Sequence, residues 1–183
     1  MTAVSYLTHT QASPGPTPLV SAEDDHRIRH FLYYESRLLD DRRYREWVEL
    51  FAEGATYEVP VRVNREEGAD AFSRSKAFDD NKATLTIRVE RLSTEFAWAE
   101  QPPSRVRHYI GNVMIAPAAE AREFEVVSNE LVYRSRGYAT EYDLFSVQRA
   151  DVLRDEAEGL RIVSRVVLMD QTTIGAHNLS LFF

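Results

Sequence analysis

The chain has 183 residues, a length typical of a single domain that can bury a core without disulfides or metals. Apolar residues make up 44% and charged residues 28% of it, an ordinary globular balance. Because the net charge is -7, the chain repels phosphate backbones, and we expect no nucleic-acid partner. Arginines are interleaved with acidic residues, which is typical of a solvated, ion-paired surface.

The absence of cysteine excludes disulfides, thiolate nucleophiles and Cys-ligated zinc or iron–sulfur sites. No apolar run approaches the roughly 20 residues that span a bilayer. The N-terminus has neither the basic start nor the apolar stretch of a signal peptide. We therefore expect a cytoplasmic protein that does not engage a membrane.

Residues 1–20 hold several prolines and few apolar side chains, so we expect a flexible N-terminal arm, followed by one domain over residues 21–183. The domain opens with a helix. Ser21 is a favourable N-cap, and the acidic residues after it suit the positive end of the helix dipole. The residues that fall close to one face of this helix are Ile28, Phe31, Leu32, Glu35, Leu38 and Leu39.

The next elements are shorter. A second helix is expected over residues 44–51, ended by Gly54, and a strand over residues 56–61. Residues 62–81 are polar without a clear period and are interpreted as a long loop. Residues 79–92 have the spacing of a third helix.

From Arg105 onward the pattern is that of strands. Residues 105–114 alternate, with Val106, His108, Ile110 and Met114 on one face. Further β-branched and aromatic runs cover residues 122–136, 138–154 and 160–172, separated by turn residues. Four long strands with short connections predict an antiparallel meander. Helices followed by a meander indicate an α+β domain, with helices packed on one face of a curved sheet.

Two histidine positions are candidate sites. His26 and His30 share a helix face at a spacing that can bind a metal, but no third ligand follows at a fixed distance, so we interpret them as solvated. His108 is expected on the concave side of the sheet. There it is either a hydrogen-bonded core residue or a general base, with Tyr57, Tyr142 and Asp143 as possible companions.

Two further features suggest contacts with other chains. Arg105 and Arg107 lie on the strand face opposite His108, where they are expected either to bind an acidic neighbouring subunit or to form ion pairs within the chain. The chain ends Asn178-Leu179-Ser180-Leu181-Phe182-Phe183 without a polar tail. An apolar end of this kind is expected to be buried, in its own core or against a partner.

Three blocks of sequence resemble a known family. They are FLYYESRLLDDRRYREWVELFAEGATYEVPVRVNR at 31–65, WAEQPPSRVRHYIGNV at 98–113, and DLFSVQRADVLR at 143–154 followed by LMDQTTIGAHNLSLFF at 168–183. In order and spacing they are similar to the small, beta subunits of Rieske non-haem iron aromatic-ring-hydroxylating dioxygenases of the biphenyl, benzene and naphthalene type. The resemblance covers about residues 28–183.

The resemblance implies a nuclear-transport-factor-like (SnoaL-like) cone and an assembly of three alpha and three beta subunits, the beta subunits forming a trimer. It implies that the alpha subunit carries the Rieske [2Fe-2S] cluster, the mononuclear iron and the substrate pocket, with electrons from NADH through a reductase. The complex would convert aromatic compounds to cis-dihydrodiols. The beta subunit would be structural, with no catalytic, cofactor-binding or metal-binding residue of its own.

The residues agree with this division of labour. A Rieske cluster needs two cysteines, and this chain has none. The alternatives are a stand-alone isomerase or dehydratase of the ketosteroid isomerase or scytalone dehydratase type, and a ligand-binding cone without chemistry. Both rest on fold analogy, which is weak evidence for a function.

Overall fold

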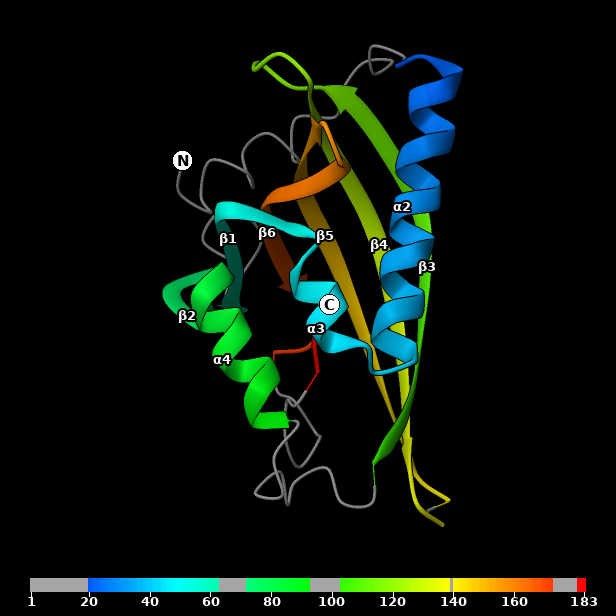
Figure 1. Cartoon of the computed structure of the whole chain (residues 1–183). Coiled ribbons are helices and arrows are strands. Elements are labelled where there is room, and N and C mark those ends of the chain that lie inside the picture. Colours follow the sequence, from blue (N-terminus) through cyan, green and yellow to red (C-terminus); the bar gives the residue numbers. More distant parts are fainter. Residues whose placement is uncertain (1–19, 63–71, 93–102, 139, 173–180) are drawn as a thin grey trace.

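The computed structural model describes residues 20–62, 72–92, 103–138, 140–172 and 181–183, so all of the expected arm except residue 20 lies outside the described residues. Helices α2 (Ala22–Asp40), α3 (Tyr44–Val48) and α4 (Lys82–Leu92) lie on one side of a curved six-stranded sheet (Figure 1). None of the described helices has the length and apolar character needed to cross a membrane.

Helix α2 forms as its sequence predicts. The Ser21 hydroxyl accepts a hydrogen bond from the Asp24 amide at 3.0 Å, and three acidic residues occupy the first turn. Of the face predicted to be apolar, Phe31 is half-buried and the fully buried members are Ile28, Leu32, Glu35, Leu38 and Leu39. Glu35 is therefore a charged residue on the core side of the helix.

The sheet has the order β2-β1-β6-β5-β4-β3. Its last four strands are antiparallel neighbours, which confirms the predicted meander: β3 (Ser104–Pro117), β4 (Glu123–Arg136), β5 (Tyr142–Glu156) and β6 (Gly159–Met169). Strand β1 (Phe51–Arg62) pairs parallel with β6 and antiparallel with β2 (Phe72–Asn81). The sheet is thus mostly antiparallel, and the α+β prediction is confirmed.

The interpretation of residues 62–81 as a loop was wrong for residues 72–81, which form the edge strand β2. An edge strand needs main-chain pairing on one side only, so it can form without an alternating apolar pattern. One of its side-chain contacts is an ion pair, with Lys76 Nζ at 3.0 Å from a Glu58 carboxylate oxygen of β1. Helix α4 consequently begins at Lys82 rather than at residue 79. Its start is marked by Asn81, whose side-chain oxygen accepts from the Thr84 amide at 3.0 Å.

The predicted end of the second helix was also wrong. Helix α3 stops at Val48, and Phe51 already belongs to β1. The Ile162 amide of β6 donates to the Leu50 carbonyl at 2.8 Å, which draws the chain into the sheet. Gly54 lies inside β1 with φ +76°, where the β1–β6 register shifts between Phe51 and Thr56, so it bends a strand and does not cap a helix.

Strand β3 departs from strict alternation. Asn112 has φ +51°, and the register with β4 shifts between Gly111 and Met114. An extra residue in a strand reverses the faces of all that follow it. Met114 is therefore 47% exposed instead of sharing a face with His108, and Ile115 turns into the core.

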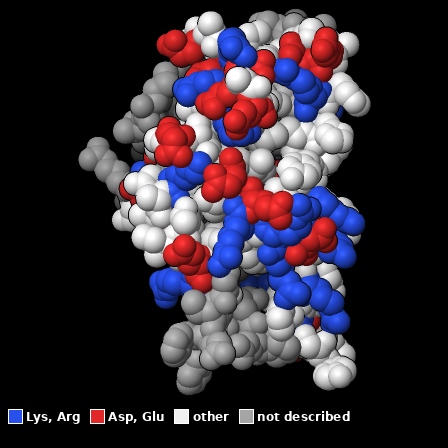
Figure 2. Space-filling view, in the orientation of Figure 1, with Lys and Arg blue, Asp and Glu red and all other residues white. Residues whose placement is uncertain are grey.

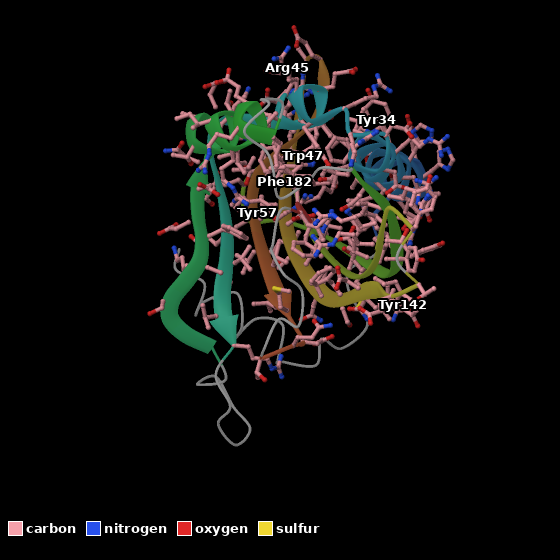
Figure 3. The ribbon with its side chains drawn as sticks, turned by 90° about the horizontal axis from the view of Figure 1, so that it is seen from below. Tyr34, Arg45, Trp47, Tyr57, Tyr142 and Phe182 are labelled. Atoms are coloured by element: carbon pink, nitrogen blue, oxygen red, sulfur yellow. The ribbon has the colours of Figure 1, made fainter. Side chains whose placement is uncertain are left out.

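The core lies between the helices and the concave face of the sheet. Trp47 stands at its centre, with ring centroids at 4.5 Å from Phe182, 5.1 Å from Phe51 and 6.3 Å from Tyr57. Figure 3 shows Trp47, Phe182 and Tyr57 gathered beneath the helices. Leu181, Phe182 and Phe183 are buried within the subunit, which confirms the tail prediction for these three residues. Leu179 and Ser180 lie outside the described residues.

Candidate functional site

The interior of the cone holds a network of acidic and basic side chains that are all buried. Its members are Glu35 of α2, Glu130 of β4, Arg149 and Asp151 of β5, and Arg165 of β6. Side chains along β4 and β5 alternate between buried and more exposed positions, and Glu130 and Arg149 lie at buried ones. Asp151 pairs directly with Arg165 in the β5–β6 register. The sheet therefore presents charges of both signs to the same helix residue.

Arg165 is the most heavily bonded member. Its Nε and Nη2 atoms donate to the two Asp151 oxygens at 2.7 and 3.0 Å, a bidentate fork. It also contacts both Glu35 oxygens, with Nη2 at 3.0 Å from Oε2. Its Nη1 donates to the main-chain oxygen of Phe183 at 2.8 Å, so the network also holds the tail.

Arg149 and Trp47 complete the bonding of Glu35. Arg149 Nη2 donates to Glu35 Oε2 at 2.8 Å, and Trp47 Nε1 donates to Oε1 at 3.0 Å. Burial by itself raises the pKa of Glu35, but the guanidinium groups of Arg149 and Arg165 lower that pKa to about 2. Glu35 is therefore an ionised acceptor whose oxygens are occupied, and it is not available as a general base.

Reasoning from the sequence missed this network, although signals for it exist. Glu35 falls on the apolar face of α2, where an unpaired carboxylate would be costly. Arg149 and Asp151 sit two residues apart in a buried strand, and Arg165 interrupts the apolar run of β6. A charge at an inward position implies a partner of opposite charge elsewhere in the chain.

The buried tail is fixed by polar contacts as well as by packing. The Phe183 amide donates to the Tyr57 hydroxyl oxygen at 3.2 Å, while the Phe182 ring packs edge-on against Tyr44 at 5.6 Å. Burial raises the pKa of Tyr57 to about 12, so this phenol stays neutral. Tyr57 acts as an anchor for the tail.

His108 connects the tail to the end of α2. Its Nδ1 lies 2.8 Å from Asp40 Oδ1, and its Nε2 lies 3.1 Å from the Phe182 carbonyl oxygen. A carboxylate oxygen and a carbonyl oxygen can only accept a hydrogen bond, so both ring nitrogens must be protonated to donate to them. Burial lowers the pKa of His108, but the hydrogen bond to Asp40 and the nearby Glu130 raise it above 6.5. The geometry favours an imidazolium that bridges two segments.

The possible companions of His108 are not assembled around it. Asp143 forms an ion pair with Arg134, with Nη2 at 2.7 Å from its carboxylate. Tyr142 is 62% exposed and lies on the outer face of the sheet, as Figure 3 shows. Tyr57 bonds to the tail amide. These contacts give each residue a different partner, and within the described part of the chain no shared catalytic arrangement results.

The remaining candidates lie at the surface. His26 and His30 are exposed, with ring centroids 6.5 Å apart, and no group of three potential metal ligands is found among the described residues. Arg105 donates to the Gly137 carbonyl at 2.8 Å, and Arg107 lies 3.7 Å from the Asp40 carboxylate. Both arginines are exposed, so their side chains are available at the surface.

Known structures share this architecture. An NTF2-like protein with a cystatin-like fold from Novosphingobium aromaticivorans matches with a TM-score of 0.56 at 16% identity, over 82% of this chain and 84% of its own. A structure of naphthalene 1,2-dioxygenase with indole bound matches better, with a TM-score of 0.75 at 24% identity, over 90% of this chain and 95% of the matched chain. The fold is therefore the nuclear-transport-factor-like cone.

Comparison of sequences identifies the family. The model of the ring hydroxylating beta subunit family matches residues 34–176, and the chain belongs to this family. The benzene 1,2-dioxygenase subunit beta of Pseudomonas putida is 39% identical in an alignment of 175 residues that covers 92% of this chain and 92% of its own. The biphenyl 2,3-dioxygenase subunit beta of Rhodococcus jostii is 37% identical, over 99% of this chain and 98% of its own. The resemblance seen in the sequence is thereby confirmed.

Proposed function

We propose that this chain is the structural beta subunit of a multicomponent dioxygenase that converts aromatic hydrocarbons or aromatic acids to cis-dihydrodiols in the cytoplasm. The observation that carries the proposal, beyond family membership, is that buried charged side chains inside the cone already have partners within the chain. Where an enzyme of this fold would need free acid–base groups, Arg149 and Arg165 both bond to Glu35, and Arg165 also holds the main-chain oxygen of the buried Phe183.

In this proposal the chemistry belongs to an alpha subunit that supplies the Rieske [2Fe-2S] cluster, the mononuclear iron and the aromatic-binding pocket. Electrons come from NADH through a reductase. The assembly contains three alpha and three beta subunits, and this chain contributes no catalytic, cofactor-binding or metal-binding residue.

The stand-alone isomerase or dehydratase is the weaker alternative. It would need His108, Tyr57 and Asp143 to converge on one ligand, and each is bonded to a different group. The particular aromatic substrate does not follow from the beta relatives. Two of them, at 39% and 37% identity, are named for benzene and for biphenyl.

The test is to purify the chain alone and together with a co-expressed Rieske alpha subunit. We expect the isolated chain to contain no stoichiometric iron and to oxygenate no aromatic compound. The co-purified complex should have the mass of three alpha and three beta chains by light scattering. About one iron per isolated chain, or failure to co-purify with any such alpha subunit of its host, would overturn the proposal.

A further inference from the structure

Two buried polar atoms inside the cone have no hydrogen-bond partner among the described residues. They are the Ser128 hydroxyl oxygen of β4 and the Nε atom of Arg149 in β5. Both residues are fully buried, and they form a direct pair in the β4–β5 register. Directly paired side chains on one face of a sheet have Cβ atoms about 4.5–5.5 Å apart, so the two unpaired groups lie beside each other.

A third group next to them is weakly bonded. Glu130 lies two residues beyond Ser128 on the same face of β4 and is also buried. Its two carboxyl oxygens lie 3.4 and 3.5 Å from Arg149 Nη1, whereas Glu35 Oε2 lies 2.8 Å from Arg149 Nη2. Because N–H···O hydrogen bonds in proteins are normally about 2.7–3.2 Å long, Glu130 can still accept a stronger hydrogen bond.

Polar groups of this kind need a partner. The charged side chains seen in Figure 2 lie at the surface, where bulk water hydrates them. Ser128, Glu130 and Arg149 are shielded from bulk water, and a buried donor or acceptor without a partner loses the free energy of its hydration. Proteins usually satisfy such groups with an ordered internal water, which makes about three hydrogen bonds. Three under-bonded groups are found here.

We infer that the cone holds an internal water site between β4 and β5, on the concave face of the sheet. The water accepts a hydrogen bond from Arg149 Nε and donates one to a carboxyl oxygen of Glu130. It exchanges a third with the Ser128 hydroxyl, which can both donate and accept. Ser128 has the smallest side chain among the buried residues of β4, which leaves room for a small molecule beside it.

The types of donor and acceptor favour water over an ion. An anion would add charge to a network that already contains three carboxyl groups, of Glu35, Glu130 and Asp151, and only two guanidinium groups. A cation would lie against the N–H group of Arg149 Nε, which can only donate. Water both donates and accepts, so it can satisfy all three groups without adding charge.

High-resolution crystallography of the full chain tests the site directly. We expect an electron-density peak within about 3.2 Å of both Ser128 Oγ and Arg149 Nε in every copy. A second crystal, of protein purified in bromide in place of chloride, distinguishes water from an anion by anomalous scattering. An anomalous peak at the site contradicts the inference. So does a structure in which Ser128 and Arg149 Nε bond to protein groups with no peak between them.

Variants at Ser128 give a second readout, by urea unfolding followed by tryptophan fluorescence. Ser128→Ala should keep the water on its other two partners, whereas Ser128→Val fills the site and leaves both unpaired. We expect Ser128→Val to raise the equilibrium constant for unfolding about tenfold more than Ser128→Ala does. If the site were dry, Ser128→Ala would only remove an unpaired hydroxyl and would not lower stability.

Val126→Ile is the matched control, because it adds volume at the neighbouring buried position of β4. A loss for Ser128→Val no larger than that for Val126→Ile counts against the water site. If Ser128→Val does not fold, the density peak in the wild-type structure decides. None of these outcomes depends on an alpha subunit, so the proposed function and the water site can fail separately.

Discussion

Replacing Glu35 by Gln should destabilise this protein far more than replacing a surface glutamate. The substitution keeps the shape of the side chain but removes the carboxylate shared by Arg149, Arg165 and Trp47. Removing one partner of a buried ion pair typically costs about 3–5 kcal/mol, because the remaining charges stay desolvated. A pKa lowered from 4.5 to about 2 corresponds independently to about 3 kcal/mol at neutral pH.

The measurement is urea unfolding followed by tryptophan fluorescence, since Trp47 bonds directly to Glu35. A loss of about 3 kcal/mol lowers the melting temperature of a domain this size by roughly 6–12 °C. Glu46→Gln is the control, because Glu46 also pairs with an arginine but is 53% exposed. Its effect on the free energy of unfolding should be much smaller, because water screens an exposed ion pair. A Glu35→Gln variant that loses no more than the control would refute the reasoning.

The stability difference between the wild type and Glu35→Gln should also depend on pH. The folded-state pKa of Glu35 is depressed, so its contribution is fully present above the unfolded value of 4.5 and is lost as the pH falls towards about 2. The amide that replaces this carboxylate in the variant cannot titrate. The stability difference between wild type and Glu35→Gln should therefore shrink over this range, and a difference independent of pH would contradict the assignment of the charge.

Three other expectations follow from the contacts of the tail and of the surface. Phe183→Ala should lower the free energy of unfolding by about 3–5 kcal/mol, measured in urea, because the ring is fully buried. His108→Gln should destabilise the protein most at low pH. Because the pKa of His108 is raised in the folded state, its contribution to the free energy of unfolding is present below pH 6.5 and is lost as the pH rises through the folded-state pKa. Urea unfolding at several pH values measures this. If that variant assembles normally while turnover falls by orders of magnitude, His108 is catalytic instead. Reversing the charges of Arg105 and Arg107 together should lower the yield of assembled complex in light scattering, and an unchanged yield counts against their place in an interface.

Much of the fold follows from local pattern. The N-cap at Ser21, the apolar face of α2 and the meander from β3 to β6 are all predictable from the sequence, because helical and strand periods and turn residues act over short distances. The apolar end of the chain likewise predicted burial of Leu181, Phe182 and Phe183. The family was also identifiable, since its sequence blocks extend over most of the chain.

The errors share one cause. Strand β2 forms without an apolar period because its pairing with β1 stabilises it. Gly54 bends β1 and does not end a helix, because the Leu50 carbonyl already accepts a hydrogen bond from β6. The bulge at Asn112 turns Met114 outward. Each depends on a neighbouring strand that is distant in sequence, and local propensity carries no information about it.

The amino-acid sequence by itself determined the fold class, the order of the elements and the lack of cysteine ligands for an iron–sulfur cluster. Only the tertiary structure decided what fills the cone. Glu35 and Arg165 are 130 residues apart, and His108 is 74 residues from Phe182, yet each pair is in contact. Charges so far apart in the chain become partners only when the sheet curves and brings their strands and helix together, because a hydrogen bond extends over only about 3 Å.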